Sequence, residues 1–307
     1  MIALKCPTDH DTSVDKRFPL YANLTQVCEA GEDAPWRSPE GRLSTQELLK
    51  REWNRGKRVC PLFSVFGIFN HLFVVDWLHC ADQGVTADFL GNEFEYLVKN
   101  KMPGNNQEVR CEAFREHLLT YYDDNPEVTD RLKEFAIKSF KGSTKGKGKA
   151  PRLKGSASQI RALVRFGDQM AKRFLSDDDP IESAIKTAAH HLQNCYESLR
   201  SVNEGLSHTA LHNSAKIFAI QYGALWKAHD YTRFWRPMPK MHMFLELCSS
   251  GTEPQKFWCY RDEDFGGSVA RQSKMKGSWR RIKAFCRHAL DLFRMKQHAP
   301  RLLTMNE

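Results

Sequence analysis

Acidic side chains at two distant points of the chain are the residues best suited to chemistry. Asp76 follows the apolar run at 72–75, and Asp262, Glu263 and Asp264 stand consecutively much later. Carboxylates that converge from separate parts of a chain bind Mg²⁺ or Mn²⁺, because these ions prefer oxygen ligands. Such ions activate a water or a hydroxyl group for attack on a phosphodiester. The pattern is therefore consistent with a metal-dependent nuclease or transferase.

The element expected to position Asp76 is a buried strand at 71–78, rich in large and β-branched apolar residues. Helical spacing of apolar residues follows, and it predicts a helix at about 85–100 that packs back on the sheet. The residues on its apolar face are Val85, Phe89, Leu90, Phe94, Leu97 and Val98. In open α/β sheets, ligands bind at the carboxyl ends of the strands. The alternative is that Asp76 caps the following helix or lies in a solvated turn.

Most of the remaining pattern is helical, which predicts an α-rich α/β fold. Helices are expected at 44–55, 107–122, 126–140, 156–176, 180–203 and 208–233, with a further amphipathic helix after Pro239. The expected segments are a loop-rich start at 1–43, a first core part at 44–137, a Gly/Lys-rich loop at 138–155, a helical stretch at 156–235, C-terminal helices at 236–301 and a frayed tail at 302–307.

The net charge of +9 favours a polyanionic partner, most simply a nucleic acid. Residues 138–154 hold seven basic residues and no acid, and residues 271–301 hold ten against one acid. The predicted phosphate contacts are Lys141, Lys145, Lys147, Lys149, Arg152 and Lys154 in the loop, and Arg280, Arg281, Lys283 and Arg287 in a basic amphipathic helix. The alternative for the loop is a solvated linker.

Other patterns exclude function classes. Nine cysteines without CxxC spacing argue against a zinc ribbon and a disulfide scaffold. No signal-peptide apolar region and no run of about 18 apolar residues occurs, so a nuclear or cytoplasmic protein that is neither secreted nor membrane-spanning is expected. The acids 177–179 precede Pro180, as at an ordinary helix start. His208 and His212 lack the Glu of a zincin motif.

The order of several short motifs resembles that of cut-and-paste DNA transposases of the Asp-Asp-Glu type, and more closely that of transposon-derived proteins of dinoflagellates. The motifs are Asp76-Trp77-Leu78-His79, Gly84-Val85, Leu90-Gly91, Pro239-Lys240-Met241-His242 and Asp262-Glu263-Asp264. The resemblance covers about residues 60–300. It implies a partial RNase H-like core with a large all-helical insertion, Mg²⁺ or Mn²⁺ as cofactor, and DNA as partner.

Carried over by residue, the resemblance assigns Asp76 to the second Asp, His79 to its companion histidine, Glu263 to the Glu and His242 to the Pro-Lys-x-His histidine. Asp262 and Asp264 would be further metal ligands. The first Asp has no counterpart, because Asp9, Asp11, Asp15 and Asp33 do not end an apolar strand.

The expectation is therefore a transposon-derived nucleic-acid-binding protein, truncated or inactive as a transposase. If it is active, it is expected to be a Mg²⁺- or Mn²⁺-dependent transposase or nuclease. The alternative is a non-catalytic helical module that binds DNA, RNA or another protein. Whether the protein forms a homo-oligomer stays open.

Overall fold

The computed structural model describes residues 45–54, 75–140, 150–202, 208–230, 232–249, 254–260, 263 and 266–267. The chain divides into two compact units, Met1–Trp258 and Cys259–Glu307. Every regular element within the described residues is a helix, so the α-rich part of the predicted fold class is confirmed there. An RNase H-like sheet is not a feature of these residues.

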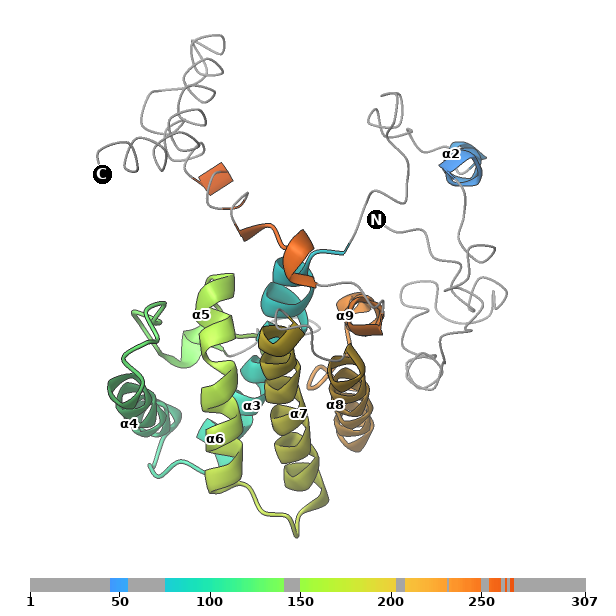
Figure 1. The fold of residues 1–307 in the computed structure, drawn as a ribbon. Coiled ribbons are helices and arrows are strands. Elements are labelled where there is room, and N and C mark those ends of the chain that lie inside the picture. The colour runs from blue at the N-terminus through green and yellow to red at the C-terminus, as the bar shows by residue number, and fades with distance from the viewer. Residues whose placement is uncertain are drawn as a thin grey trace, which may run out of the picture. The chain divides into compact units, whose positions relative to one another are not determined.

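The helices of the first unit are coloured by position in Figure 1. They are α2 (Thr45–Asn54), the π-helix η4 (Leu78–Thr86), α3 (Ala87–Asn100), α4 (Gln107–Asp124), the 3₁₀ turn η5 (Ile137–Ser139), α5 (Ala157–Ala162), α6 (Val164–Phe174), α7 (Pro180–Val202), α8 (His208–Ala228), α9 (Pro239–Ser249) and η6 (Pro254–Phe257). Helix α7 packs between α6 and α8, α9 contacts α8 and η4, and α3 contacts α4 and α6.

The expected strand at 71–78 is wrong where the structure describes it. Val75 and Asp76 have no regular structure, Trp77 is already helical, and η4 continues without a break into α3. A short apolar run does not distinguish a buried strand from the start of a buried helix. Residues 71–74 lie outside the described part of the chain.

The apolar face predicted for the helix at 85–100 is confirmed. Val85, Phe89, Leu90, Phe94, Leu97 and Val98 are each at most 3% exposed. Phe94 contacts Phe114 and Phe166 with ring centroids 5.0 and 5.8 Å apart, and so joins α3 to α4 and α6. Burial of such aromatic side chains is the main source of stability in a helical core.

The helix expected at 126–140 is wrong, because irregular backbone occupies 125–136 before η5. Here side chains satisfy the backbone: the N–H of Leu132 donates to the Tyr122 hydroxyl at 3.1 Å, and Arg131 Nη2 donates to the Tyr122 carbonyl at 2.7 Å. Phe135 stacks on Phe114 with centroids 5.3 Å apart. The tertiary contacts of these side chains override local helix propensity.

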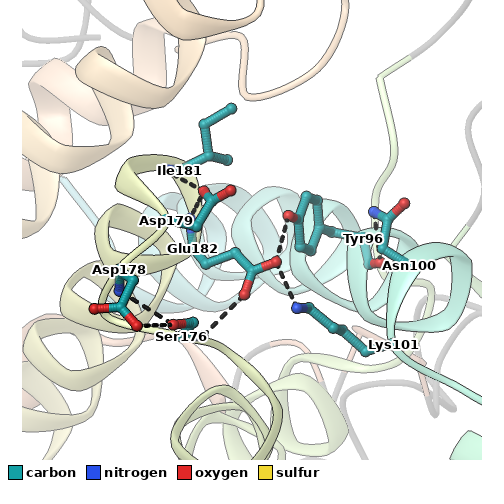
Figure 2. Close-up of polar contacts among 8 residues, drawn as sticks. All are labelled: Tyr96, Asn100, Lys101, Ser176, Asp178, Asp179, Ile181 and Glu182. Atoms are coloured by element: carbon teal, nitrogen blue, oxygen red, sulfur yellow. Dashed lines mark hydrogen bonds and ion pairs between the residues drawn. The ribbon is translucent and has the colours of Figure 1, made fainter.

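The acids before Pro180 form a helix start, as the sequence predicts. Asp179 Oδ1 accepts hydrogen bonds from the N–H groups of Ile181 and Glu182 at 2.8 and 3.0 Å (Figure 2). Asp177 pairs instead with Lys186 at 2.7 Å. An aspartate at this position satisfies N–H groups that have no partner inside the helix.

The carboxylate of Glu182, in the first turn of α7, joins this helix to α3. Its Oε1 accepts from Lys101 Nζ at 2.6 Å and from the Tyr96 hydroxyl at 3.0 Å, and its Oε2 accepts from the Ser176 N–H at 2.9 Å (Figure 2). Burial alone would raise the pKa of Glu182. The hydrogen bonds outweigh burial, so the pKa lies below its ordinary value of 4.5.

Glu182→Gln is expected to lower the free energy of unfolding at pH 7 by about 2 kcal/mol, because a charge-assisted hydrogen-bond set is lost. A carboxyl whose pKa is lowered in the folded state stabilises above its unfolded pKa and ceases to do so as the pH falls through the folded pKa. The difference between parent and variant should therefore shrink between pH 5 and pH 3. Urea unfolding followed by circular dichroism at several pH values measures it.

The matched control is Glu112→Gln, which breaks an exposed ion pair with Arg115. Exposed pairs contribute little, so this variant should unfold like the parent at every pH. An equal loss in both variants, or a Glu182→Gln deficit that is the same at pH 3 and pH 7, would contradict the role given to Glu182.

Candidate functional site

Asp76 stands at the start of the helical stretch that carries the candidate site. Its Oδ1 accepts from the Leu78 N–H at 3.3 Å, and its Oδ2 accepts from the His79 N–H at 2.9 Å. The Asp76 carbonyl accepts from the Cys80 N–H at 3.0 Å. These are the contacts of a helix-capping aspartate, so Asp76 caps the following helix, as the alternative interpretation of the sequence predicts.

The side chain of His79 lies against the same carboxylate. Its Nδ1 is 2.7 Å from Asp76 Oδ2, and the histidine side chain is half exposed whereas that of Asp76 is 19% exposed. A carboxylate bound to one ring nitrogen fixes the orientation of the imidazole. In chemical type, an imidazole nitrogen and a carboxylate oxygen fit a Mn²⁺ or Mg²⁺ site, although these two groups alone do not complete one.

The start of α9 packs against η4 and brings a second predicted motif to Asp76 and His79. Lys240 Nζ donates to the His79 carbonyl at 2.7 Å, and Cys80 Sγ donates to the Lys240 carbonyl at 3.4 Å. Gly84 makes this approach possible, because a Cβ there would lie 2.7 Å from Lys240 Cδ. Burial raises the pKa of the Cys80 thiol to about 12, so this cysteine is a poor nucleophile at neutral pH.

A chain of buried polar side chains joins η4 to α7. The Tyr196 hydroxyl on α7 donates to Asp82 Oδ1 at 2.6 Å and shares a hydrogen bond of 2.7 Å with Thr86 Oγ1. All three side chains are buried, and Trp77 packs edge-on against the Tyr196 ring. This chain of hydrogen bonds fixes the π-helix, a rare element that frequently occurs at functional sites.

His242, the histidine of the Pro-Lys-x-His segment, lies on α9 and is 7% exposed. Its Nε2 is 3.6 Å from Glu246 Oε1, one turn further along the same helix. The predicted auxiliary histidines thus differ: His79 is half exposed beside Asp76, whereas His242 is enclosed in the helical packing.

Two of the predicted phosphate contacts lie in described residues, and both have intramolecular partners. Arg152 pairs with Asp88 at 2.7 Å and also donates to the Gln83 carbonyl, while Lys154 Nζ donates to the Lys138 carbonyl. The backbone around them is ordered, because the N–H groups of Arg152 and Lys154 donate to the carbonyls of residues 140 and 139. The last residues of the 138–155 loop are thus hydrogen-bonded to residues at its start.

The remaining predicted contacts lie outside the described residues. These are Lys141, Lys145, Lys147 and Lys149 in the loop and Arg280, Arg281, Lys283 and Arg287 in the tail. Their assignment stays a prediction.

The acidic residues 262–264 belong to the second unit, Cys259–Glu307. Glu263 is exposed and has helical backbone, and its N–H donates to the Cys259 carbonyl at 2.9 Å. Asp262 and Asp264 lie outside the described residues. The predicted metal set of Asp76, Asp262, Glu263 and Asp264 therefore stays a prediction.

Several buried polar residues were missed by sequence analysis. Asp82 and Glu93 are fully buried, and Asp168 is 6% exposed. A signal was present for Glu93, which falls one turn from Phe89 and Leu97 on the apolar stripe of α3. A charged residue on the buried face of an amphipathic helix is informative, because it is rarely buried without a partner.

Comparison with known proteins identifies no relative of this chain. No protein-family model matches the chain, and no curated protein or solved structure is significantly similar to it. Within the described residues, none of the helices has the length and apolar character needed to cross a membrane.

Proposed function

We propose that this chain is a nucleic-acid-binding protein that descends from a metal-dependent DNA transposase. The observation that supports the proposal is the packing of the Asp76-x-x-His79 segment against the Pro239-Lys240-x-His242 segment. Lys240 follows His79 by 161 positions in sequence, yet its side chain donates directly to the His79 carbonyl. Segments that resemble parts of one ancestral active site would be expected to meet in this way.

Within the first unit, the residue that would hold an ion in this proposal is Asp76, through its carboxylate, with the His79 imidazole beside it. A bound Mg²⁺ or Mn²⁺ would supply charge neutralisation and an activated oxygen nucleophile. Asp76 orients the imidazole, and its capping hydrogen bonds keep the carboxylate in place. Lys240 holds η4 against α9 and so preserves the spacing between the two histidines.

Nucleic-acid binding is expected to depend chiefly on the loop lysines between 141 and 149. Arg152 is already paired with Asp88, so its charge is partly neutralised within the protein. Lysines that contact phosphates release counterions from DNA, which makes affinity fall steeply with salt.

We expect labelled duplex DNA to bind the full chain with a strongly salt-dependent affinity. If about four phosphates are contacted, log K should fall against log salt with a slope of about −3.6. Lys145→Gln, Lys147→Gln and Lys149→Gln combined should reduce the steepness by about three units. Fluorescence anisotropy between 50 and 300 mM salt measures both slopes.

The matched control removes the same charge elsewhere, through Lys99→Gln, Lys133→Gln and Lys227→Gln on exposed positions of the helical unit. This triple variant should retain the parent slope. Equal effects of the two triple variants would show that net charge alone drives binding. Absence of DNA and RNA binding at 50 mM salt would instead leave a protein-interaction module, and duplex cleavage in Mn²⁺ that Asp76→Asn abolishes would show that catalysis survives.

A further inference from the structure

Glu93 is a buried acid in the middle of α3. It is 0% exposed, and neither carboxylate oxygen accepts a hydrogen bond from any part of the chain that the structure describes. A buried polar group without a hydrogen bond costs free energy, and an ionised one costs far more. An acid in such a place is stabilised by keeping its proton, which leaves it uncharged.

The carboxyl group of Glu93 lies at the contact between α3 and α6. A Cβ built on Gly167 of α6 would lie 2.9 Å from Glu93 Oε2 and 2.8 Å from Leu90 Cδ2, so the carboxyl group rests close to the α6 backbone. The next residue of α3, Phe94, packs on Phe166 of α6 with ring centroids 5.8 Å apart. Separation of α3 from α6 would therefore bring water directly to the carboxyl group.

The charged groups of α6 and α7 on this side do not neutralise Glu93. Asp168 follows Gly167, and its negative charge disfavours ionisation of Glu93. Lys172 Nζ donates to Asp168 Oδ2 at 2.7 Å. His190 Nδ1 on α7 lies 3.7 Å from Asp168 Oδ1 and 3.4 Å from Lys172 Nζ. The basic groups at this corner thus pair with Asp168.

The other neighbours of α3 give the same result. Helix α4 meets α3 through the aromatic ring of Phe114, which carries no charge. The backbone before α5 brings Arg152 to α3, where its guanidinium pairs with Asp88 at 2.7 Å. Within the part of the chain that the structure describes, Asp168 is therefore the charged side chain that affects Glu93, and it opposes ionisation.

We propose that Glu93 is a proton-operated switch in the helical unit. Its carboxyl group carries a proton while α3 and α6 are packed together. When the proton passes to solvent, the carboxylate must be hydrated and is repelled by Asp168, and both effects loosen α6 from α3. The inference concerns the contact of these two helices and does not rest on the proposed function.

The direction of the pH dependence follows from burial. Burial raises the pKa of Glu93 well above its ordinary value of 4.5, and Asp168 raises it further. Below the unfolded pKa, both states hold the proton and the stability is fully present. As the pH rises from the unfolded towards the folded pKa, the unfolded state alone has released its proton. The unfolding equilibrium constant should then rise about tenfold per pH unit.

The test is urea unfolding of the full chain at several pH values from 5 to 8, for the parent, Glu93→Gln and Glu93→Met. Neither variant can ionise, so the unfolding constant of the parent should grow relative to theirs by about tenfold per pH unit, up to the folded pKa. Glu93→Met covers the case in which the buried amide of Glu93→Gln prevents folding. Glu116→Gln, which changes an exposed acid on α4, is the matched control and should follow the parent at every pH.

Amide hydrogen exchange, corrected for its intrinsic pH dependence, tests whether the contact of α3 and α6 loosens. From pH 5 to pH 8, the protection of α6 amides in the parent should fall at least about tenfold more than that of α8 amides, and in the Glu93 variants it should not. The proposal is overturned if the parent and the Glu93 variants have parallel stability profiles. It is also overturned if α6 and α8 lose protection equally, because the opening is then global.

Discussion

Gly91→Ala is expected to destabilise the first unit strongly. A Cβ at Gly91 would lie 2.3 Å from the Cα, 2.5 Å from the N and 2.6 Å from the carbonyl carbon of Arg152. These are backbone atoms, so no side-chain rotation relieves the collision. The segment around Arg152 must move away from α3, or α3 itself must bend.

Moving this segment breaks several contacts at once. The Leu153 N–H donates to the Ala87 carbonyl at 2.8 Å, Asn92 Nδ2 donates to the Pro151 carbonyl at 3.3 Å, and Arg152 pairs with Asp88 at 2.7 Å. Each is worth about 1 kcal/mol, and the gain from replacing glycine by alanine in a helix offsets about 1 kcal/mol. The net loss in the free energy of unfolding should be about 2–4 kcal/mol.

Urea unfolding followed by far-ultraviolet circular dichroism measures this loss. Gly155→Ala is the matched control, because its Cβ would meet only the ends of the Leu132 and Gln159 side chains, at 3.1 and 3.3 Å. That variant should stay within about 1 kcal/mol of the parent. Gly91→Ala with parental stability would mean that the backbone of 151–153 does not rest on α3.

The sequence predicted the helical periodicity of the first unit well, because burial follows directly from the spacing of large apolar residues. Phe89, Phe94 and Leu97 were assigned to the buried face of a helix and are fully enclosed. Helix starts could be predicted equally well where they depend on hydrogen bonds between residues close in sequence. The acid before Pro180 caps α7 because its hydrogen bonds reach only two and three residues along the chain.

Structure that depends on contacts between residues far apart in the chain could not be predicted from local sequence. Trp77 and Leu78 have strand-like side chains, but Trp77 packs on Tyr196 and Phe244, which lie more than 110 positions later. Those contacts favour a helix where local composition favours a strand. For the candidate site, the sequence motif placed Asp76 and His79 together. The hydrogen bond between Asp82 and Tyr196 depends on how α7 packs against η4, which local sequence does not determine.

Tyr196→Phe tests the buried chain that holds η4, and it is expected to cost about 2–3 kcal/mol. The hydroxyl donates to Asp82 at 2.6 Å and meets Thr86 at 2.7 Å. Burial raises the pKa of Tyr196 well above its ordinary value, so the hydroxyl keeps its proton and remains a donor. The phenyl ring still packs on Trp77 and beneath the Arg161 guanidinium, so the change removes only the hydroxyl's hydrogen bonds.

Tyr122→Phe provides the comparison, because that hydroxyl accepts from a backbone N–H at 3.1 Å and not from a carboxylate. Its loss should be about 1 kcal/mol, since a neutral hydrogen bond is weaker than one to a charged group. A double-mutant cycle between Tyr196→Phe and Asp82→Asn then isolates the direct interaction. A coupling free energy of at least about 1 kcal/mol is expected for groups in one network. Additive effects would show that Asp82 is held by other contacts, and that α7 does not fix the π-helix through this tyrosine.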